Sequence, residues 1–366
     1  MTTPHKLPLL PPKLDYSNFI EGLTAAHRAL AALDAFLVQS PNPKIFERTF
    51  TTKEAVLSSR IEGTIATISE VFDFDAGAEI DNMELREDAI EIINYRKALT
   101  EGITALAKKP LGENLIKQLH AVLLNSARGA NRSPGDFRKS QVYIGRPGAG
   151  IENATYVPPE PQEITPLVQN LLKYIHDMPE RDELVRIAVA HYQFEAIHPF
   201  LDGNGRVGRL LITLLLQEKG LLSHPYLYLS EFFETNRHEY YEGLRSVSQD
   251  SQWEAWVAFF LGAIADQATA GAALAREVAE LYKNLQPQFV QISNEYGLLL
   301  LNTVFQRPIF TTTTLREQMK MTNIQTAYTL VEKLVGSGFV KDLTPEKQRG
   351  KRYEFSELLR IVRGSQ

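Results

Sequence analysis

The sequence of 366 residues contains no cysteine. No disulfide, thiolate nucleophile or cysteine-ligated metal site can therefore form within it. This composition is typical of a reducing compartment, and we expect a cytoplasmic location. Long apolar runs are missing too: stretches such as Leu210–Leu216 fall far short of the about 20 residues of a membrane-spanning helix. Prolines also interrupt MTTPHKLPLLPPKLDY at the N-terminus, which has no apolar run of signal-peptide length.

An excess of positive charge is missing as well. The net charge is -5, which argues against general affinity for nucleic acids or membranes, although a local basic patch remains open. Hydrophobic residues make up 44% of the chain and charged residues 23%, which is typical of a globular protein. The length indicates two or three domains.

Most of the chain has helical periodicity. Apolar residues recur at steps of three and four in LTAAHRALAALDAFLV, REDAIEIINYRKALTEGITALAKK and DELVRIAVAHYQFEAI. The segment RLLITLLLQEKG is apolar nearly all round and ends at Gly220, which indicates a helix in the middle of a bundle. We therefore expect a mainly α protein.

One region departs from this helical periodicity. DFRKSQVYIGRPGAGIENATYVPPEP, from Asp136, contains β-forming residues on both sides of a Gly/Pro turn, which predicts a hairpin. It is either a surface excursion or an edge that pairs with an extended peptide.

The C-terminal part differs again. After a long helix that includes Gln267–Leu285, residues 291–366 read as helix, turn, helix and two strands, with residues 324–335 as the second helix. That order is typical of a winged helix-turn-helix. DNA contact and protein binding or dimerisation are equally open, because the second helix is not basic. Cations gather in the predicted wing at Lys341, Lys347, Arg349, Lys351 and Arg352.

The most informative stretch is HPFLDGNGRVGR, residues 198–209. Its GNGRVG matches G-x-G-x-x-G, but a helix precedes it where a dinucleotide fold needs a strand. Gly203 and Gly205 permit unusual backbone conformations just before a helix, and such a turn plus a helix N-terminus binds anions, above all phosphate. Arg206 and Arg209 lie on one face of the first turns and suit a polyphosphate.

The other polar residues of this stretch fit the same ligand. Asp202 is a hard oxygen ligand for a magnesium ion that bridges phosphates. Asn204 offers an amide donor to a phosphoryl oxygen. His198 precedes a proline, so its helix must stop there, and an imidazole beside a phosphate site suits a general base better than a packing role. The spacing of His191, Glu195 and His198 leaves a zinc site as the alternative.

HPFLDGNGRVGR resembles the signature of Fic-domain proteins, HPFx[DE]GNGRxxR, at every defined position. The resemblance covers about residues 115–262 and implies a helical core that transfers AMP from ATP to a protein hydroxyl. It implies that His198 is the base, that Asp202 holds magnesium, and that Asn204 and the amides of Gly203 and Gly205 bind phosphates. It further assigns Arg206 and Arg209 to the β- and γ-phosphates. The resulting division is residues 1–105 as an N-terminal helical region, 106–266 as the core, 267–290 as a connecting helix and 291–366 as the winged-helix-like domain.

The resemblance extends to two flanking elements. The hairpin would be the flap that pairs with the target, with Val142, Ile144, Gly145 and Tyr156 as its flap residues. Tyr240 and Tyr241 stand where family members line the ribose and adenine side, and their alternative is helix packing. Relatives often have an asparagine where this chain has Ser248, so no ligand contact is assigned to that serine.

SSRIEGT, residues 58–64, needs a separate explanation. Gly63 is typical of the position after a helix end, which places Glu62 in the last turn, where a carboxylate is unfavourable unless a cation compensates. Arg60 or solvent is the simplest compensation. Ser58, Glu62 and Gly63 also resemble the Fic inhibitory motif [ST]xxxE[GN]. By that resemblance Glu62 pairs with Arg209 and occupies the place of the γ-phosphate.

Two classes of function follow. The first is a self-inhibited protein adenylyltransferase that uses ATP and Mg²⁺ on Ser, Thr or Tyr of target proteins and of itself. The second is a nucleotide-sensing regulator that binds DNA through its C-terminal domain. The intact His198 favours the enzyme, and a hydrolase that removes AMP remains a variant of it. A homodimer is open, and a membrane partner is not expected.

Overall fold

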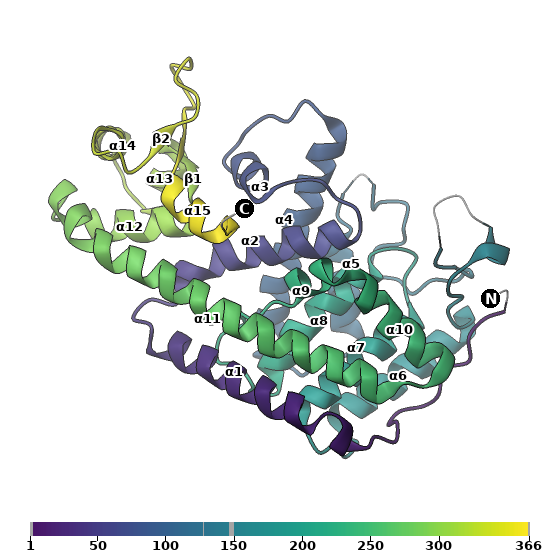
Figure 1. The fold of residues 1–366 in the computed structure, drawn as a ribbon. Coiled ribbons are helices and arrows are strands. Elements are labelled where there is room, and N and C mark those ends of the chain that lie inside the picture. Colours follow the sequence, from purple (N-terminus) through teal and green to yellow (C-terminus); the bar gives the residue numbers. More distant parts are fainter. Residues whose placement is uncertain (1–2, 127, 146–149, 365–366) are drawn as a thin grey trace.

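The computed structural model describes residues 3–126, 128–145 and 150–364, and within them it is mainly helical, as predicted (Figure 1). The helices of the main body are α1 (Ile20–Gln39), α2 (Lys44–Ile61), α3 (Ile68–Asp75), α4 (Met83–Leu106), α5 (Glu113–Leu123), α6 (Ile164–His176), α7 (Glu183–Ile197), α8 (Asn204–Glu218), α9 (Ser230–Thr235), α10 (Arg237–Asp250) and α11 (Trp253–Ile292). Short 3₁₀ turns are η1 (Tyr16–Asn18), η2 (Ile151–Asn153) and η3 (Pro161–Glu163).

The helix α8 lies in the middle of the body, as its all-round apolar sequence predicts. It packs against α2, α4, α5 and α7, and nearly all of its residues from Asn204 to Leu216 are buried. The preceding α7 is buried at least as completely, so the turn between the two helices is anchored on both sides. The motif of residues 198–209 therefore joins the two innermost helices.

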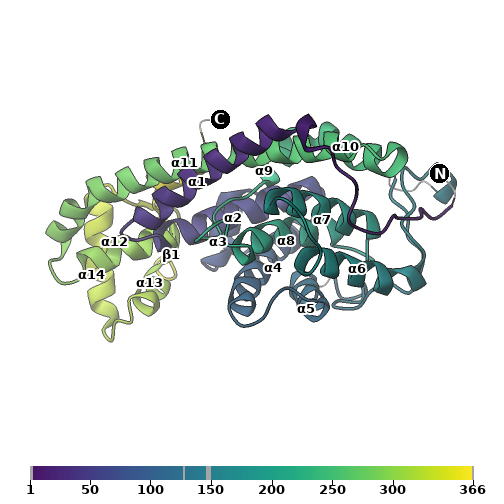
Figure 2. The ribbon, with the colours of Figure 1, turned by 90° about the horizontal axis from the view of Figure 1, so that it is seen from below.

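The long helix α11 spans Trp253–Ile292 without interruption, with Pro287 inside it, and α1 lies along it in both views (Figures 1 and 2). The predicted connecting helix is thus part of a longer one, and the predicted boundary at residues 266 and 267 falls inside it. By length and composition alone α11 is the one helix of the described residues that could cross a membrane. Its apolar residues, however, pack on α1, α7 and α10, and a core helix passes the same test.

The C-terminal part contains the predicted order of helix, turn, helix and two strands. Its elements are α12 (Gly297–Gln306), β1 (Ile309–Thr311), α13 (Thr312–Gln318), α14 (Ile324–Gly336), β2 (Lys341–Asp342), β3 (Arg352–Glu354) and α15 (Ser356–Arg363). The strand order is β1-β3-β2, antiparallel throughout, with Phe310 opposite Tyr353 and Asp342 opposite the same tyrosine. Sequence periodicity missed β1, because three residues are too few to show alternation.

Within its described residues, the hairpin of residues 141–159 has a single antiparallel bridge, between Ile144 and Tyr156. Ile144 N–H donates to the Tyr156 carbonyl at 2.8 Å, and Thr155 N–H donates to the Ile144 carbonyl at 2.8 Å. The two strands expected from the β-forming residues are absent from the described part, and the tip at residues 146–149 lies outside it. Pro158 and Pro159 lack the N–H groups with which a second strand would continue the ladder.

The helix α2 ends beside the turn that leads into α8. It packs against α4, α8, α9 and α12, so both the body and the C-terminal part hold it in place. Behind the site its Glu54 is buried, and its carboxylate accepts from the hydroxyls of Tyr95 and Ser230. Burial raises the pKa of Glu54. The position of the last turn of α2 is therefore set by tertiary contacts on several sides.

Candidate active site

A cleft of about 660 Å³ lies between the end of α2, the turn before α8, the hairpin and α10. Residues of the signature and of the inhibitory motif share it, although they are far apart in the sequence. The lining includes Glu62, His198, Gly205, Arg209, Tyr240, Tyr241 and, from the hairpin, Tyr143, Ile144, Gly145, Thr155 and Tyr156.

His198 is the residue at which α7 ends, as the following proline predicts. Its backbone is left-handed, with φ of 50°, a conformation that a residue other than glycine adopts mostly where its surroundings enforce it. Arg138 enforces it here: Nε donates to the His198 carbonyl and the backbone N–H to the Pro199 carbonyl, both at 2.9 Å. The buried Arg138 thereby braces the turn, and nothing in the sequence pattern pointed to it.

The imidazole of His198 is oriented for one protonation state. Its Nδ1 lies 3.3 Å from the Glu195 carbonyl, an acceptor, so Nδ1 carries the proton and Nε2 keeps a free lone pair. Burial lowers the pKa of His198 to about 4, and the nearby Arg138 guanidinium acts in the same direction. A neutral imidazole with a free Nε2 on the cleft wall is suited to accept a proton at neutral pH.

Hydrogen bonds from Asn204 and His120 hold the turn that follows His198 in place. Asn204 accepts from the Phe200 N–H at 2.8 Å and donates to the Phe200 carbonyl at 2.9 Å. Its buried amide therefore braces the turn, and the predicted phosphate contact of Asn204 stays a prediction. His120 from α5 stacks on the Phe200 ring with centroids 3.7 Å apart, and its Nε2 donates to the Asp202 carbonyl at 3.0 Å.

Gly203 is the N-cap of α8 and has a φ of 77°, in the left-handed region. We expect Gly203→Ala to lower the free energy of unfolding by about 1–2 kcal/mol, because an L-residue with a Cβ is strained there. Urea denaturation measures the change. Gly262→Ala in α11 is the control, since open space surrounds that glycine and alanine favours a helix. Equal stability of Gly203→Ala and the unaltered protein would contradict the expectation.

The carboxylate of Glu62, from the end of α2, lies against the N-terminal end of α8. Its Oε1 lies 2.6 Å from Arg209 Nη2, and Arg209 also donates to the Ser58 hydroxyl and the Ser58 carbonyl, each at 2.9 Å. A Cβ on Gly205 would lie 2.3 Å from that Oε1, so only glycine leaves room for the carboxylate. Burial acts to raise the pKa of Glu62, but the Arg209 guanidinium more than offsets it, and the pKa is held below its usual value.

The helix end that carries Glu62 has the geometry predicted for it. Glu62 is the C-cap of α2, and Gly63 follows with a φ of 103°. The expected compensating cations come from other helices: Arg209 from α8, and Arg237 from α10, whose guanidinium donates to the Ile61 carbonyl. The pairing of Arg209 with Glu62 that the resemblance implies is thus present, while the phosphate contact of Arg209 and the inhibitory role of Glu62 stay predictions.

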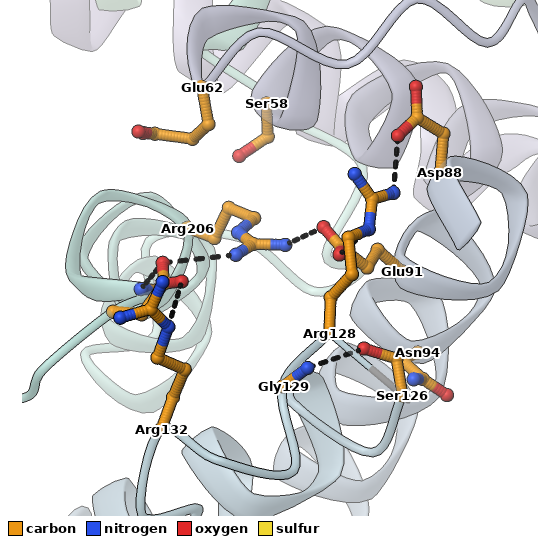
Figure 3. Close-up of polar contacts among 12 residues, drawn as sticks. Ser58, Glu62, Asp88, Glu91, Asn94, Ser126, Arg128, Gly129, Arg132 and Arg206 are labelled. Carbon is orange, nitrogen blue, oxygen red and sulfur yellow. Dashed lines mark hydrogen bonds and ion pairs between the residues drawn. The ribbon is translucent and has the colours of Figure 1, made fainter. Parts of the chain in front are cut away.

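Arg206 of α8 points toward Glu91 (Figure 3), and Asp202 lies near Arg206. Arg206 donates to Glu91 of α4 at 2.6 Å, and its Nη2 is 3.5 Å from Asp202, which also faces Arg132 at 3.8 Å. Asp202 is 45% exposed and offers the hard oxygen that Mg²⁺ prefers. The described residues contain no group of three or more His, Asp or Glu side chains able to hold an ion by themselves. The role of Asp202 as a magnesium ligand stays a prediction.

The two adjacent tyrosines of α10 differ in their exposure to the cleft. Tyr240 is buried, and its hydroxyl pairs with His191 Nε2 at 3.0 Å. Tyr241 is 44% exposed on the cleft. His191 also contacts the Gly208 carbonyl through Nδ1 at 3.2 Å, so both of its ring nitrogens have protein partners and the zinc alternative lacks its first ligand. Ser248 lines the cleft and pairs with the Tyr192 hydroxyl at 2.9 Å.

Three of the predicted flap residues line the cleft: Ile144, Gly145 and Tyr156. Val142 is not among the lining residues, whereas its neighbour Tyr143 is. Tyr156 donates its hydroxyl to the Ala196 carbonyl at 2.9 Å, which fastens the hairpin to the end of α7. The bridge residues are therefore held at the entrance beside His198.

A neutral imidazole, the N-terminal end of α8 and a carboxylate that fills that end thus meet in one cleft. Residues 20–104 match the family described as Fic/DOC family N-terminal, and residues 110–216 match the Fic/DOC family. The two matches together cover more than half of the chain. The chain belongs to the Fic/DOC family.

Curated relatives and solved structures agree with this membership. The probable protein adenylyltransferase of Aquifex aeolicus (strain VF5) is 29% identical over 177 residues, which are 46% of this chain and 50% of the relative. Protein adenylyltransferase fic-1 of Caenorhabditis elegans is 30% identical over 151 residues, which are 40% of this chain and 27% of the relative. The chain thus spans half or less of these relatives' length.

Among solved structures, a Fic family protein from Desulfovibrio desulfuricans G20 has a TM-score of 0.62 at 20% identity and covers 94% of this chain and 98% of its own. A Fic domain containing signaling protein from Bacteroides thetaiotaomicron has a TM-score of 0.55 at 19% identity, covering 71% of this chain and 97% of its own. At these identities the likeness shows the fold.

Proposed function

We propose that the protein is a self-inhibited protein adenylyltransferase that transfers AMP from ATP to a hydroxyl of a target protein and of itself. The observation that carries the proposal is the neutral imidazole of His198, with Nε2 free, on the same cleft as the helix end bound by Glu62. The names of the relatives support AMP transfer. The location would be the cytoplasm, in accordance with the lack of cysteine.

The proposed transfer of AMP requires few side chains of the protein. The target oxygen forms a bond to the α-phosphorus as the α–β phosphoanhydride bond breaks, pyrophosphate leaves, and the hydroxyl proton goes to Nε2 of His198. Arg209, the N–H groups at the start of α8 and Arg206 would bind the phosphates, so catalysis consists mostly of positioning and charge neutralisation. A magnesium ion on Asp202 would neutralise further phosphate charge. The bridge residues of the hairpin would hold the target segment beside His198.

The position of a radioactive phosphate tests the reaction. When the Glu62→Gly variant is incubated with Mg²⁺ and ATP, label at the α-phosphate should enter the protein, and label at the γ-phosphate should not. The γ-labelled sample is the matched control, because it differs only in which phosphate is followed. Transfer of γ-label would show a phosphotransferase instead. Loss of α-label from a modified target would favour the hydrolase that removes AMP.

The DNA-binding alternative has weaker support. Of the five wing cations, Lys351 pairs with Asp342 at 2.7 Å and Arg352 pairs with Asp73 of α3 at 3.3 Å. Cations that are paired within the chain contribute less to a phosphate-binding surface. A shift of random or promoter duplexes at physiological salt would nonetheless support a second role for the C-terminal part.

A further inference from the structure

Arg206 is held by an acid to which no sequence pattern pointed. Glu91 projects from α4, and its Oε2 accepts from Arg206 Nη1 at 2.6 Å (Figure 3). Both side chains are largely withdrawn from solvent, with 6% of Arg206 and 11% of Glu91 exposed. A buried ion pair of this kind fixes the orientation of the planar guanidinium more firmly than a solvated pair does.

The contact leaves one edge of the guanidinium unused. Arg206 Nε is buried and has no hydrogen-bond partner among the described residues. Nη2 has only the Asp202 carboxylate, at 3.5 Å. Nε and Nη2 point their N–H groups from the same edge and form the two-pronged donor that matches two oxygens of a phosphate. An unpaired buried donor is costly, so this edge is suited to an incoming anion.

Glu91 is itself prevented from turning away. Its other oxygen accepts from Arg128 Nε at 3.1 Å, and Arg128 also pairs with Asp88, one turn earlier on α4 (Figure 3). Asp88 accepts in turn from the Ile65 N–H at 2.8 Å, in the segment that follows Gly63. Carboxylates and guanidiniums alternate along this series of contacts, so each charged side chain lies beside a group of opposite charge.

We propose that Glu91 is a positioning residue for the nucleotide phosphates. It holds Arg206 by Nη1 and so keeps the Nε and Nη2 edge available for a phosphate group, while Arg128 holds Glu91 in place. The inference rests on the proposed function for the identity of the ligand as a nucleoside triphosphate. Glu91 touches neither the nucleotide nor the reacting atoms in this arrangement, so it acts through Arg206.

Binding of ATP and of adenosine to the full-length Glu62→Gly protein, measured by titration calorimetry, tests the proposal. Adding Glu91→Gln should raise the Kd of ATP by about tenfold, in the range found for coupled pairs, and leave the Kd of adenosine unchanged. Adding it to Arg206→Ala should weaken ATP binding no further, since the group it positions is gone. Glu84→Gln is the matched control, because it removes the same charge from an exposed place on the same helix. If Glu91→Gln does not fold, Arg128→Ala, whose side chain is 44% exposed, should weaken ATP binding selectively but less.

Three results would overturn the proposal: an unchanged Kd of ATP, a tighter Kd of ATP, or equal weakening of ATP and adenosine. The second would mean that Glu91 competes with phosphate for Arg206, and the third that its role is structural. Failure of the proposed function has a different signature. In that case the Glu62→Gly protein would bind ATP without transferring AMP, whatever the effect of Glu91→Gln on binding.

Discussion

The Glu62→Gly variant is expected to transfer AMP to protein at least about tenfold faster than the unaltered chain, a factor that a competition worth only ~1.4 kcal/mol already produces. In the structure the Glu62 carboxylate lies against Gly205 and pairs with Arg209 at 2.6 Å, at the helix end where an anionic phosphate would bind. Its removal leaves Arg209 and the N–H groups of α8 to the nucleotide. Initial rates of incorporation of α-labelled ATP measure the effect.

Three further variants separate the causes of this activation. Glu62→Gln keeps the size of the side chain and loses its charge, so it should activate if the ion pair is the brake and stay silent if bulk alone blocks the site. Glu62→Ala controls for the added backbone freedom of glycine at the C-cap of α2. Ser58→Ala removes one hydrogen bond to Arg209 and should activate less than either. A folded Glu62→Gly protein with unchanged labelling would reject self-inhibition.

Loss of His198 is expected to reduce AMP transfer by about 10²–10⁴-fold in the Glu62→Gly background, the usual contribution of a general base. His198→Asn is preferable to His198→Ala, because asparagine tolerates the left-handed backbone found there, with φ of 50°. Intact mass after incubation with ATP and Mg²⁺ should show an added AMP group only when His198 is present. Binding of ATP should change little, and retained transfer would exclude His198 as the base.

The expected pH dependence of AMP transfer follows from the pKa of His198. A general base acts in its unprotonated form, so activity is present above its pKa and is lost as the pH falls through it. Burial lowers the pKa of His198 to about 4, whereas an ordinary histidine titrates at 6.5. The rate of the Glu62→Gly protein should therefore stay level from pH 8 down to about pH 5. Half-maximal kcat/KM near pH 6.5 would contradict the lowered pKa.

Local chemistry allowed much of the site to be predicted. The proline after His198 and the glycine after Glu62 each end a helix for reasons that need only neighbouring residues. The left-handed Gly203 and the centrally buried α8 follow from glycine's lack of a Cβ and from all-round apolarity. The resemblance to Fic proteins named Arg209 as the partner of Glu62, which periodicity and spacing could not have done.

Other parts of the site depend on contacts between distant segments. Arg138 braces the turn at His198, and Glu91 holds Arg206, yet neither residue stands in a motif. The described part of the hairpin has one bridge where the sequence predicted two strands, because β-forming side chains need a continuous ladder of N–H donors to pair. Val142, which was predicted as a flap residue, does not line the cleft, whereas Tyr143, which was not predicted, does.

The sequence alone determined the helical class, the ends of α2 and α7, and the presence of a glycine-containing turn at the start of a helix with a histidine beside it. These depend on periodicity and on the backbone preferences of glycine and proline, which act over a few residues. The tertiary structure alone decided that Glu91 meets Arg206 and that Arg237 meets the end of α2, whereas the resemblance had already implied the pair of Glu62 and Arg209 that the structure contains. An ion pair depends on distance in space, and no spacing along the chain records the packing of α2, α4, α8 and α10 that brings these groups together.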